Sequence, residues 1–357
     1  MKKVVYLDLH VIQSVPPSCL NRDDTGSPKT AIYGGARRAR VSSQAWKRAM
    51  RLMFKDYFDE SELGTRTLRV YELIAAEILN SHPEVEKDEG LKKAQDILKK
   101  VKVNPSKKGA EDKVDALFFL SAQQAKNLSL LAMGETHDKD EEKEIIKALR
   151  TGNSIDVALF GRMVAANPLL NCDASAQVAH AISTHRVENE YDYFTAIDDL
   201  SPEDNAGAGM IGTVEYNSAT LYRYATVAAH ELHNQLAGDP AALEKAIREF
   251  TRAFICAMPT GKQNTFAAHT LPDAVLAAVR TDRPLSLAGA FESPVRGEGI
   301  TAASAMGMEK YAESVYADFC AKPEKSYVIG PYLPGLGERV TLDGLLERIG
   351  KDICDTV

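Results

Sequence analysis

The residues best suited to chemistry lie between Thr25 and Lys55, here called the basic segment. It holds eight Lys or Arg and no Asp or Glu, although the whole chain carries a formal net charge of −7. Gly34 and Gly35 predict a flexible loop where backbone can approach a ligand closely. A positive island on an acidic protein suits a polyanion bound through its phosphates. The residues alone leave open a plainer alternative, a solvated helix face beside a basic loop.

A helix is predicted within the basic segment, starting near Gln44 after a possible cap at Ser42 and Ser43. Its apolar residues recur at helical spacing and predict a buried face: Trp46, Ala49, Met50, Met53 and Tyr57. Lys47, Arg51 and Lys55 recur on a different face. Because helix N-termini bind phosphate and a row of cations binds nucleic-acid backbone, both features predict such contacts.

Catalysis has one candidate, the adjacent Asp23 and Asp24. A metal-dependent nuclease normally needs several convergent carboxylates, and no others can be assigned nearby. The alternative is that the aspartates cap their loop or position Arg22. His180 and His185 are five residues apart, which is wrong for a zinc pair on one helix face. No metal site, cofactor or nucleotide-binding loop is therefore predicted.

Length and composition indicate an ordinary globular protein. The 357 residues allow roughly two domains, or one domain with a large insertion. No apolar run approaches the roughly 18 residues of a membrane span, and Asp8 and His10 interrupt the apolar N-terminus, which argues against a signal peptide. The five cysteines are scattered and form no CxxC pair. We expect a cytoplasmic protein with no membrane partner.

The strands and helices that must position the basic segment are predicted in the following order along the chain. A strand alternating over Val4–Ile12 precedes a loop over Ser14–Gly35, the basic helix to about Phe58, and a helix-forming insertion over Ser61–Arg150. The later predictions are a strand from Ala179, strands over Tyr191–Leu200 and Thr213–Val227, a helix over Pro240–Met258, a strand over Ala274–Arg280, and helices over Thr301–Lys322 and Leu342–Cys354. Without the insertion, this is the split βαβ order of ferredoxin-like and RNA-recognition-motif domains, an α+β fold with a projecting hairpin.

Several motifs resemble the backbone subunit of the type I-E CRISPR Cascade, the CasC family of the RAMP superfamily. They cover most of the chain in order and are weakest over Glu60–Arg150 and after Gly297. The matching stretches are LNRDD (Leu20–Asp24), AIYGGARRARVSSQAWKRAMR (Ala31–Arg51), GRM (Gly161–Met163), AHAISTHRV (Ala179–Val187), DYFTAIDDL (Asp192–Leu200), GTVEYNSATLYRYA (Gly212–Ala225) and GKQNTFAA (Gly261–Ala268).

The resemblance implies a hand-shaped, non-catalytic scaffold without a cofactor. An RNA-recognition-motif palm would take residues 1–60, 151–190 and 213–357, with helical fingers over 61–150 and a thumb hairpin over 191–212. Copies would stack head to tail along a CRISPR guide RNA, together with other Cascade subunits. Each thumb would fold over the guide held by its neighbour and leave short guide segments free to pair with target DNA.

The resemblance also assigns residues. Guide contacts are implied for Arg22, Lys29, Arg37, Arg38, Arg40, Ser42, Gln44, Lys47, Arg51, Lys262 and Gln263, with Phe194 in the thumb. Met163 would wedge against the bases, whereas an isolated Met predicts a core residue from sequence alone. Related type III subunits use a comparable loop aspartate for metal-dependent RNA cleavage, so an RNase using Asp23 or Asp24 is the alternative. The chain departs from the family at Lys139–Lys147, where acids interleave a lysine patch that can contact duplex DNA.

Overall fold

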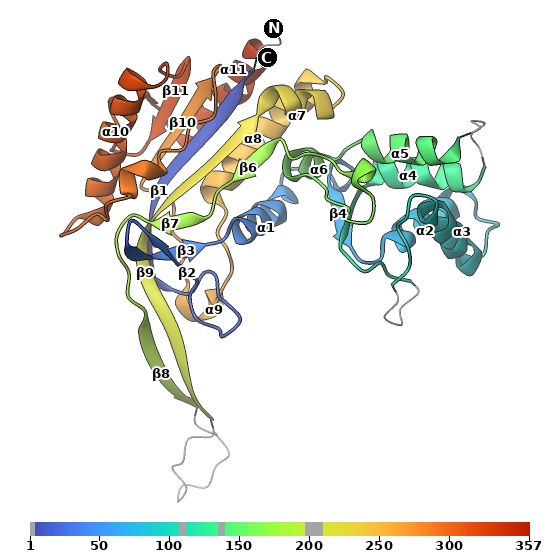
Figure 1. The fold of residues 1–357 in the computed structure, drawn as a ribbon, viewed down its shortest axis with the longest axis horizontal. Coiled ribbons are helices and arrows are strands. Elements are labelled where there is room, and N and C mark those ends of the chain that lie inside the picture. Colours follow the sequence, from blue (N-terminus) through green and yellow to red (C-terminus); the bar gives the residue numbers. More distant parts are fainter. Residues whose placement is uncertain (1–3, 107–111, 135–139, 197–209) are drawn as a thin grey trace, which may run out of the picture. The chain divides into compact units, whose positions relative to one another are not determined.

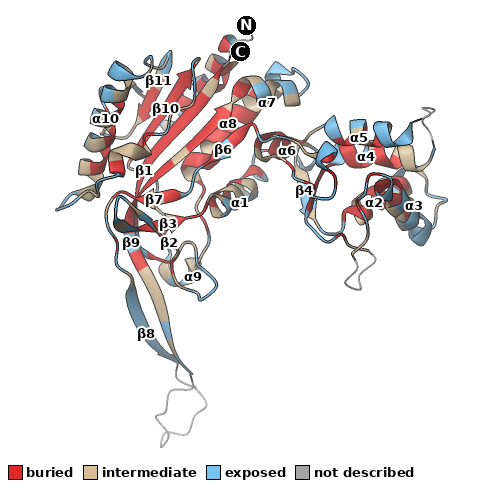
Figure 2. Cartoon of the chain, in the orientation of Figure 1, coloured by how far each residue is buried: buried red, intermediate tan, exposed pale blue. Residues whose placement is uncertain are grey.

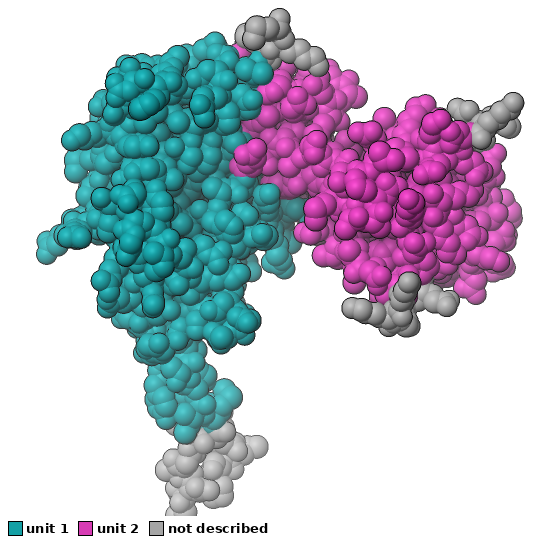
Figure 3. All heavy atoms as spheres, in the orientation of Figure 1, with its two compact units in different colours: residues 1–53, 178–226, 248–353 teal, residues 54–177, 227–247, 354–357 magenta. Residues whose placement is uncertain are grey.

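The computed structural model describes residues 4–106, 112–134, 140–196 and 210–357, which form an α+β fold (Figure 1). The described chain divides into two compact units (Figure 3). Unit 1 comprises residues 1–53, 178–226 and 248–353, and unit 2 comprises residues 54–177, 227–247 and 354–357. The tip of the predicted thumb, residues 197–209, and Lys139 lie outside the described residues. None of the described helices is long and apolar enough to cross a bilayer.

The described strands are β1 (Tyr6–Ser18), β2 (Thr30–Tyr33), β3 (Ala36–Val41), β4 (Gly64–Thr67), β5 (Phe118–Ser121), β6 (Ala176–Val178), β7 (Ala181–Ser183), β8 (Glu190–Ala196), β9 (Met210–Ala228), β10 (Ala274–Arg280), β11 (Lys325–Ile329) and β12 (Glu338–Arg339). The described α-helices are α1 (Ser43–Phe54), α2 (Val70–Ser81), α3 (Lys87–Lys99), α4 (Ala122–Ala132), α5 (Glu141–Arg150), α6 (Ile155–Phe160), α7 (Ala229–Gln235), α8 (Pro240–Cys256), α9 (Gln263–Phe266), α10 (Ile300–Asp318) and α11 (Leu342–Thr356). Short 3₁₀ turns are η1 (Glu60–Glu62), η2 (Pro168–Leu170) and η3 (Ala288–Phe291).

Unit 1 is built on a large sheet with the strand order β12-β11-β10-β1-β9-β7-β3-β2. β1 and β10 run antiparallel, from Tyr6 opposite Arg280 to Ile12 opposite Ala274. The predicted strand over Ala274–Arg280 is confirmed residue for residue, because its apolar run is buried throughout. The predicted helix over Pro240–Met258 is also confirmed, two residues shorter, as α8.

The centre of the sheet is covered on both faces, as the buried strands in Figure 2 show. On one face Ile12, Tyr222 and Leu276 pack with η3 and α10. On the other face Arg223 lies over the rings of Trp46 in α1 and Phe254 in α8. The prediction that β1 is half-buried was therefore wrong, since its polar residues Asp8 and His10 lie in the layer beneath α10. This covered part of the sheet offers no open face on which RNA could lie.

Unit 2 is mainly helical, as predicted for the insertion. Its core packs α2, α3, α4 and α5 around Tyr71, Ile74, Leu98 and Leu128. One part of the prediction was wrong, because residues 64–67 and 118–121 form the antiparallel pair β4 and β5. These strands are too short and too far apart in sequence to show a period of their own.

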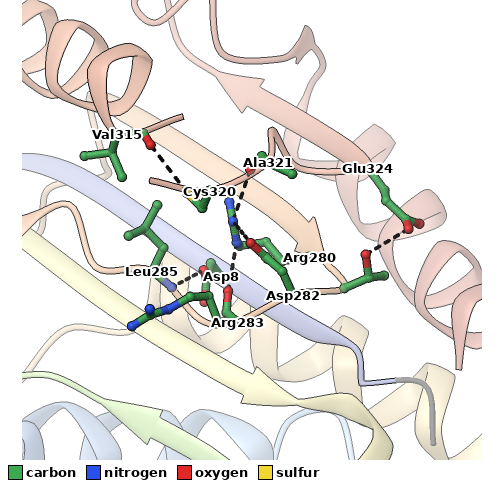
Figure 4. Close-up of polar contacts among 10 residues, drawn as sticks. Asp8, Arg280, Asp282, Arg283, Leu285, Val315, Cys320, Ala321 and Glu324 are labelled. Atoms are coloured by element: carbon green, nitrogen blue, oxygen red, sulfur yellow. Dashed lines mark hydrogen bonds and ion pairs between the residues drawn. The ribbon is translucent and has the colours of Figure 1, made fainter. Parts of the chain in front are cut away.

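Polar contacts of the buried Asp8 and Arg280 fix the segment that follows β10 (Figure 4). Arg280 donates from Nε to the carbonyl oxygen of Arg283 at 2.8 Å and from Nη2 to Asp282 Oδ2 at 2.6 Å. The Asp8 carboxylate accepts from the Leu285 backbone N–H at 2.8 Å and from the Tyr224 hydroxyl at 3.0 Å. Burial raises the pKa of Asp8 to about 6 and lowers the pKa of His10 to about 3. Both side chains are therefore poorly placed to carry a charge.

Replacing Asp8 by Asn should remove a pH dependence from the stability of the protein. The pKa of Asp8 is raised by folding, so its contribution to stability is present below its unfolded value of 3.8 and is lost as pH rises through about 6. A shift of about two units corresponds to up to about 3 kcal/mol. Urea unfolding should show the wild type gaining stability relative to D8N, by up to that amount, as pH falls from 8 to 4. Parallel stability curves for the two proteins would contradict this.

Candidate nucleic-acid interface

The glycine pair of the basic segment forms the turn of a tight hairpin. β2 and β3 pair antiparallel, with Tyr33 opposite Ala36, and Gly34 and Gly35 have φ of +56° and +71°. A Cβ on Gly34 would lie 1.6 Å from the Glu292 carbonyl oxygen, so this position requires glycine. The predicted flexible loop is thus corrected to a hairpin held against the chain near Glu292.

The three arginines predicted as one basic arm have different surroundings. Arg37 is exposed and Arg40 is half-buried, but Arg38 is fully buried. The Arg38 guanidinium donates to four carbonyl oxygens within 3.2 Å, those of Ser183, Thr184, Phe291 and Glu292. These bonds use the N–H groups of the guanidinium inside the protein. The prediction that Arg38 contacts RNA is therefore wrong. Alternation along the strand places Arg37 on the opposite face from Arg38 and Arg40. Arg38 differs from Arg40 only through the carbonyl oxygens that surround its guanidinium, and no sequence pattern reports these.

Lys29 and Arg40 are brought together where the loop after β1 meets β3. The Lys29 N–H donates to the Asn21 carbonyl oxygen at 2.9 Å, and the Arg40 N–H donates to the Lys29 carbonyl oxygen at 2.9 Å. The Arg40 side chain donates from Nε to the Thr30 carbonyl oxygen at 3.3 Å. Backbone bonds therefore hold both cations beside the start of α1.

The N-terminus of α1 is capped by the protein itself. Ser42 is the cap, as predicted, and its Oγ accepts from the Ala45 N–H at 3.3 Å while its carbonyl oxygen accepts from the Trp46 N–H at 3.2 Å. The Ser43 N–H points at His180 Nδ1, 3.3 Å away. The Ser42 N–H also donates to Asn21 Oδ1, at 2.9 Å. Three of the four N–H groups that a helix leaves unbonded at this end, those of Ser42, Ser43 and Ala45, are thus already bonded, which corrects the expectation that they are open to phosphate. Ser42 itself is buried, so its observed role is the cap.

The two faces of α1 differ as predicted. Trp46, Ala49 and Met50 are buried, while Gln44 is exposed and Lys47 and Arg51 are half-buried. Partial burial lowers the pKa of Lys47 below its ordinary value. Tyr57 was wrongly placed on the buried face, because α1 ends at Phe54 and Tyr57 is 41% exposed. The helix therefore has a polar face with Gln44, Lys47 and Arg51, while its opposite, buried face packs on the sheet.

Arg223 of β9 holds the buried face of α1 against the sheet and is called here the anchor of α1. Sequence reasoning did not single it out. Its guanidinium lies 3.9 Å from the Trp46 ring centroid and 4.8 Å from that of Phe254. It donates to Gln13 Oε1 at 2.6 Å and to the Phe254 carbonyl oxygen at the end of α8. Gln13 in turn donates to the Thr270 carbonyl oxygen at 2.8 Å. No local pattern links these residues, since they meet only through the fold.

The loops that carry Arg22 and Lys262 pack directly against each other. Leu20–Gly26 and Gly261 line one open cavity of about 550 Å³. A Cβ on Gly261 would lie 2.3 Å from the Leu20 carbonyl oxygen, so the two backbones touch. Lys262 has φ of +49°, a conformation that non-glycine residues adopt rarely and often at functional sites. The structure thus brings Arg22 and Lys262 to one place, with Gln263 starting α9 beside them.

The predicted projecting hairpin is formed as far as the described residues reach. β8 pairs with the first part of β9, from Glu190 opposite Tyr216 to Ala196 opposite Met210. All of β8 is exposed. Phe194 covers Gly212, where a Cβ would lie 2.5 Å from the ring. An isolated two-stranded hairpin is marginally stable in water, so this surface suits a partner that covers it.

Met163 belongs to unit 2 and is 81% exposed, not a core residue. The adjacent Arg162 is buried and holds the loop in place. It donates to the carbonyl oxygens of Leu170 and Phe119 at 3.1 Å, and its backbone pairs with Cys172 in both directions at 2.9 Å. A large apolar side chain on a fixed loop has the form that a wedge requires.

The candidate catalytic aspartates belong to the Arg22 loop. Asp23 Oδ1 accepts from the Thr25 N–H at 3.0 Å, the Thr25 hydroxyl at 2.7 Å and the Ser27 N–H at 3.0 Å. The hydrogen bond from the Thr25 hydroxyl is the main cause that lowers the pKa of Asp23. Within the described ranges no group of three His, Cys, Asp or Glu could hold a metal ion. The geometry is that of a carboxylate capping its own turn.

Together these features define an α+β protein with a cation-lined surface beside a projecting hairpin. The chain matches the family described as CT1975-like protein over residues 7–343 and belongs to that family. It is similar to a chain of a "CRISPR RNA-guided surveillance complex, pre-nicking", at 32% identity and a TM-score of 0.83 over 98% of this chain and 100% of that chain. A chain of a "CRISPR RNA-guided surveillance complex" matches at 29% identity and a TM-score of 0.63 over 97% and 99%. No curated protein matches.

These matches confirm the broader part of the resemblance found in the sequence. The chain is of the kind found in CRISPR surveillance complexes of the Cascade type. The finer assignment, to the type I-E backbone subunit, stays a prediction.

Proposed function

We propose that the protein is the non-catalytic backbone subunit of a type I-E Cascade. It binds a CRISPR guide RNA, stacks head to tail with copies of itself in the cytoplasm, joins other Cascade subunits, and presents the guide for pairing with target DNA in antiviral defence. The observation that carries the proposal is the gathering of cations from three separate segments, on α1, at Lys29 with Arg40, and in the loops of Arg22 and Lys262.

The form of this surface supports single-stranded RNA as the ligand. The sheet centre is covered by α10, so the unpaired face that an RNA-recognition motif uses for bases is closed. The remaining basic groups suit phosphate contacts, which hold a strand without reading its sequence. The spatial order β10-β1-β9-β7 supports a ferredoxin-like palm, in which α1 and α8 are the two crossover helices.

The hairpin and Met163 supply the remaining parts of the proposal. The fully exposed β8 suits a thumb covered by the guide and a neighbouring copy, and the exposed Met163 suits a wedge between bases. In the fingers, Lys143 lies 2.6 Å from Asp140 and Lys147 lies 3.7 Å from Glu144. These ion pairs favour fingers that do not bind duplex DNA, the departure already visible in the sequence.

A metal-dependent RNase with the same architecture is the alternative function. The three hydrogen bonds that Asp23 accepts within its own turn favour the scaffold, because they all go to Oδ1 and so occupy one of the two carboxylate oxygens that a metal could use.

One experiment tests both functions. The native mass of the protein is measured with and without co-expressed guide RNA, and the assembly is then incubated with complementary RNA and Mg²⁺. The scaffold predicts a multi-copy complex on one RNA and no cleavage. A monomer free of RNA would overturn the scaffold, and regularly spaced cuts that Asp23→Ala abolishes would establish the RNase.

A further inference from the structure

His180 contacts two of the segments that form the candidate interface, α1 and β3. It lies immediately before β7 and is exposed. Its Nδ1 is 3.3 Å from the backbone nitrogen of Ser43 at the start of α1. The same Nδ1 is 3.3 Å from an Nη1 of Arg40 in β3. The ring therefore fixes the position of Arg40 relative to the helix.

These two contacts determine the tautomer of the ring. A backbone N–H and a guanidinium can only donate hydrogen bonds, so Nδ1 must be the acceptor. The proton of the neutral imidazole is then on Nε2. Partial burial, followed by the charges of Arg40 and Lys29, lowers the pKa of His180 and favours this neutral form. Because the two ring nitrogens point in different directions, Nε2–H is aimed away from the Ser43 N–H.

We propose that His180 is a further RNA-binding residue, donating Nε2–H to a phosphate oxygen while Nδ1 holds the N-terminus of α1 and the Arg40 side chain. The proposal rests on the proposed function, RNA binding at this surface. Arg40 and Lys29 supply charge there, and the ring adds a donor whose direction is fixed by its other nitrogen. A neutral donor can select the position of one phosphate without adding to the charge of the surface.

This neutral contact has a distinct signature in salt. Removing a cation that neutralises one phosphate of a single strand should reduce the slope of log K against log salt by about 0.7. Removing a neutral donor should lower affinity at every salt concentration and leave the slope unchanged. A hydrogen bond to a charged group contributes about 1.5–3 kcal/mol, so the loss should be about tenfold or more.

Two substitutions separate the roles of the two ring nitrogens. Asn can place an oxygen near the position of Nδ1, whereas Gln can place its amide near the position of Nε2. We expect H180N to keep the wild-type Tm and to bind a fixed single-stranded RNA about tenfold more weakly, with the wild-type salt slope. We expect H180Q to lower Tm through loss of the hydrogen bond from the Ser43 N–H, and to bind RNA more tightly than H180N.

The controls make each failure recognisable. Lys29→Gln should weaken binding and reduce the salt slope. If H180N bound RNA as tightly as the wild type, or if its slope fell as that of Lys29→Gln does, the proposal for His180 would be overturned. If the wild type itself did not bind RNA, the proposed function would fail instead.

Discussion

Replacing Lys47 and Arg51 together by Ala should abolish stable assembly of the protein on guide RNA. Both cations lie on the polar side of α1, whose opposite face is buried through Trp46, Ala49 and Met50. Removing one phosphate-binding cation should lower the salt slope for a single strand by about 0.7, hence by about 1.4 for the pair. The measurement is RNA affinity at several salt concentrations, with native mass as the readout of assembly.

The matched control removes the same charge elsewhere in unit 1. Lys310 in α10 and Lys351 in α11 are both exposed, and replacing both by Ala changes the net charge by the same amount. We expect this control to keep the wild-type salt slope. Equal effects of the two double substitutions would mean that RNA responds to net charge and that α1 has no special role.

Arg223→Ala should destabilise the protein by about 3–5 kcal/mol, because it leaves buried acceptors without their donor and opens a space between two rings. Those acceptors are Gln13 Oε1 and the Phe254 carbonyl oxygen, and the rings belong to Trp46 and Phe254. Urea unfolding should show a lower midpoint with an unchanged m-value. An unchanged midpoint would contradict the role of Arg223 as the anchor of α1.

Arg223→Met is the matched variant for this prediction. The Met side chain can fill the space between the rings but cannot donate to the acceptors, so its loss of stability should be smaller than that of Arg223→Ala. RNA affinity should fall in both variants, since α1 and the segment ending at Thr270 share this anchor. Full affinity in a destabilised Arg223→Ala would show that the anchor serves stability alone.

The sequence predicted those parts of the fold that carry their own local signal. The apolar run of β10, the amphipathic α8 and the serine cap of α1 were all readable from residue type and spacing. The hairpin of β2 and β3 was missed, although its Gly34-Gly35 turn is plain in the sequence, because β2 has only four residues and β3 is rich in arginine, so that both resemble a loop.

The candidate site was predictable in its charges but not in its contacts. Arg37, Arg38 and Arg40 are identical in type, and only the carbonyl oxygens of Ser183, Thr184, Phe291 and Glu292, which come from distant segments, show that Arg38 is buried. Arg223 and His180 reach partners on distant segments, so no local period reports their roles. For Met163 the residue type alone predicted burial, and this was wrong, because the side chain is exposed. The exposure agrees with the role that the family motif implies.

The continuity of β9 has a consequence for how the hairpin can change in length. β9 has 19 residues, of which the first part belongs to the exposed hairpin and the last part to the buried sheet. Because the strand is continuous, the side chains of both parts follow the same alternation between its two faces. Losing one residue of β9 between Tyr216 and the buried part of the strand would turn Tyr216 to the opposite face relative to the buried side chains. Losing two residues from each strand would keep every remaining side chain on its present side. Hairpins of related chains should therefore grow and shrink in steps of two residues per strand.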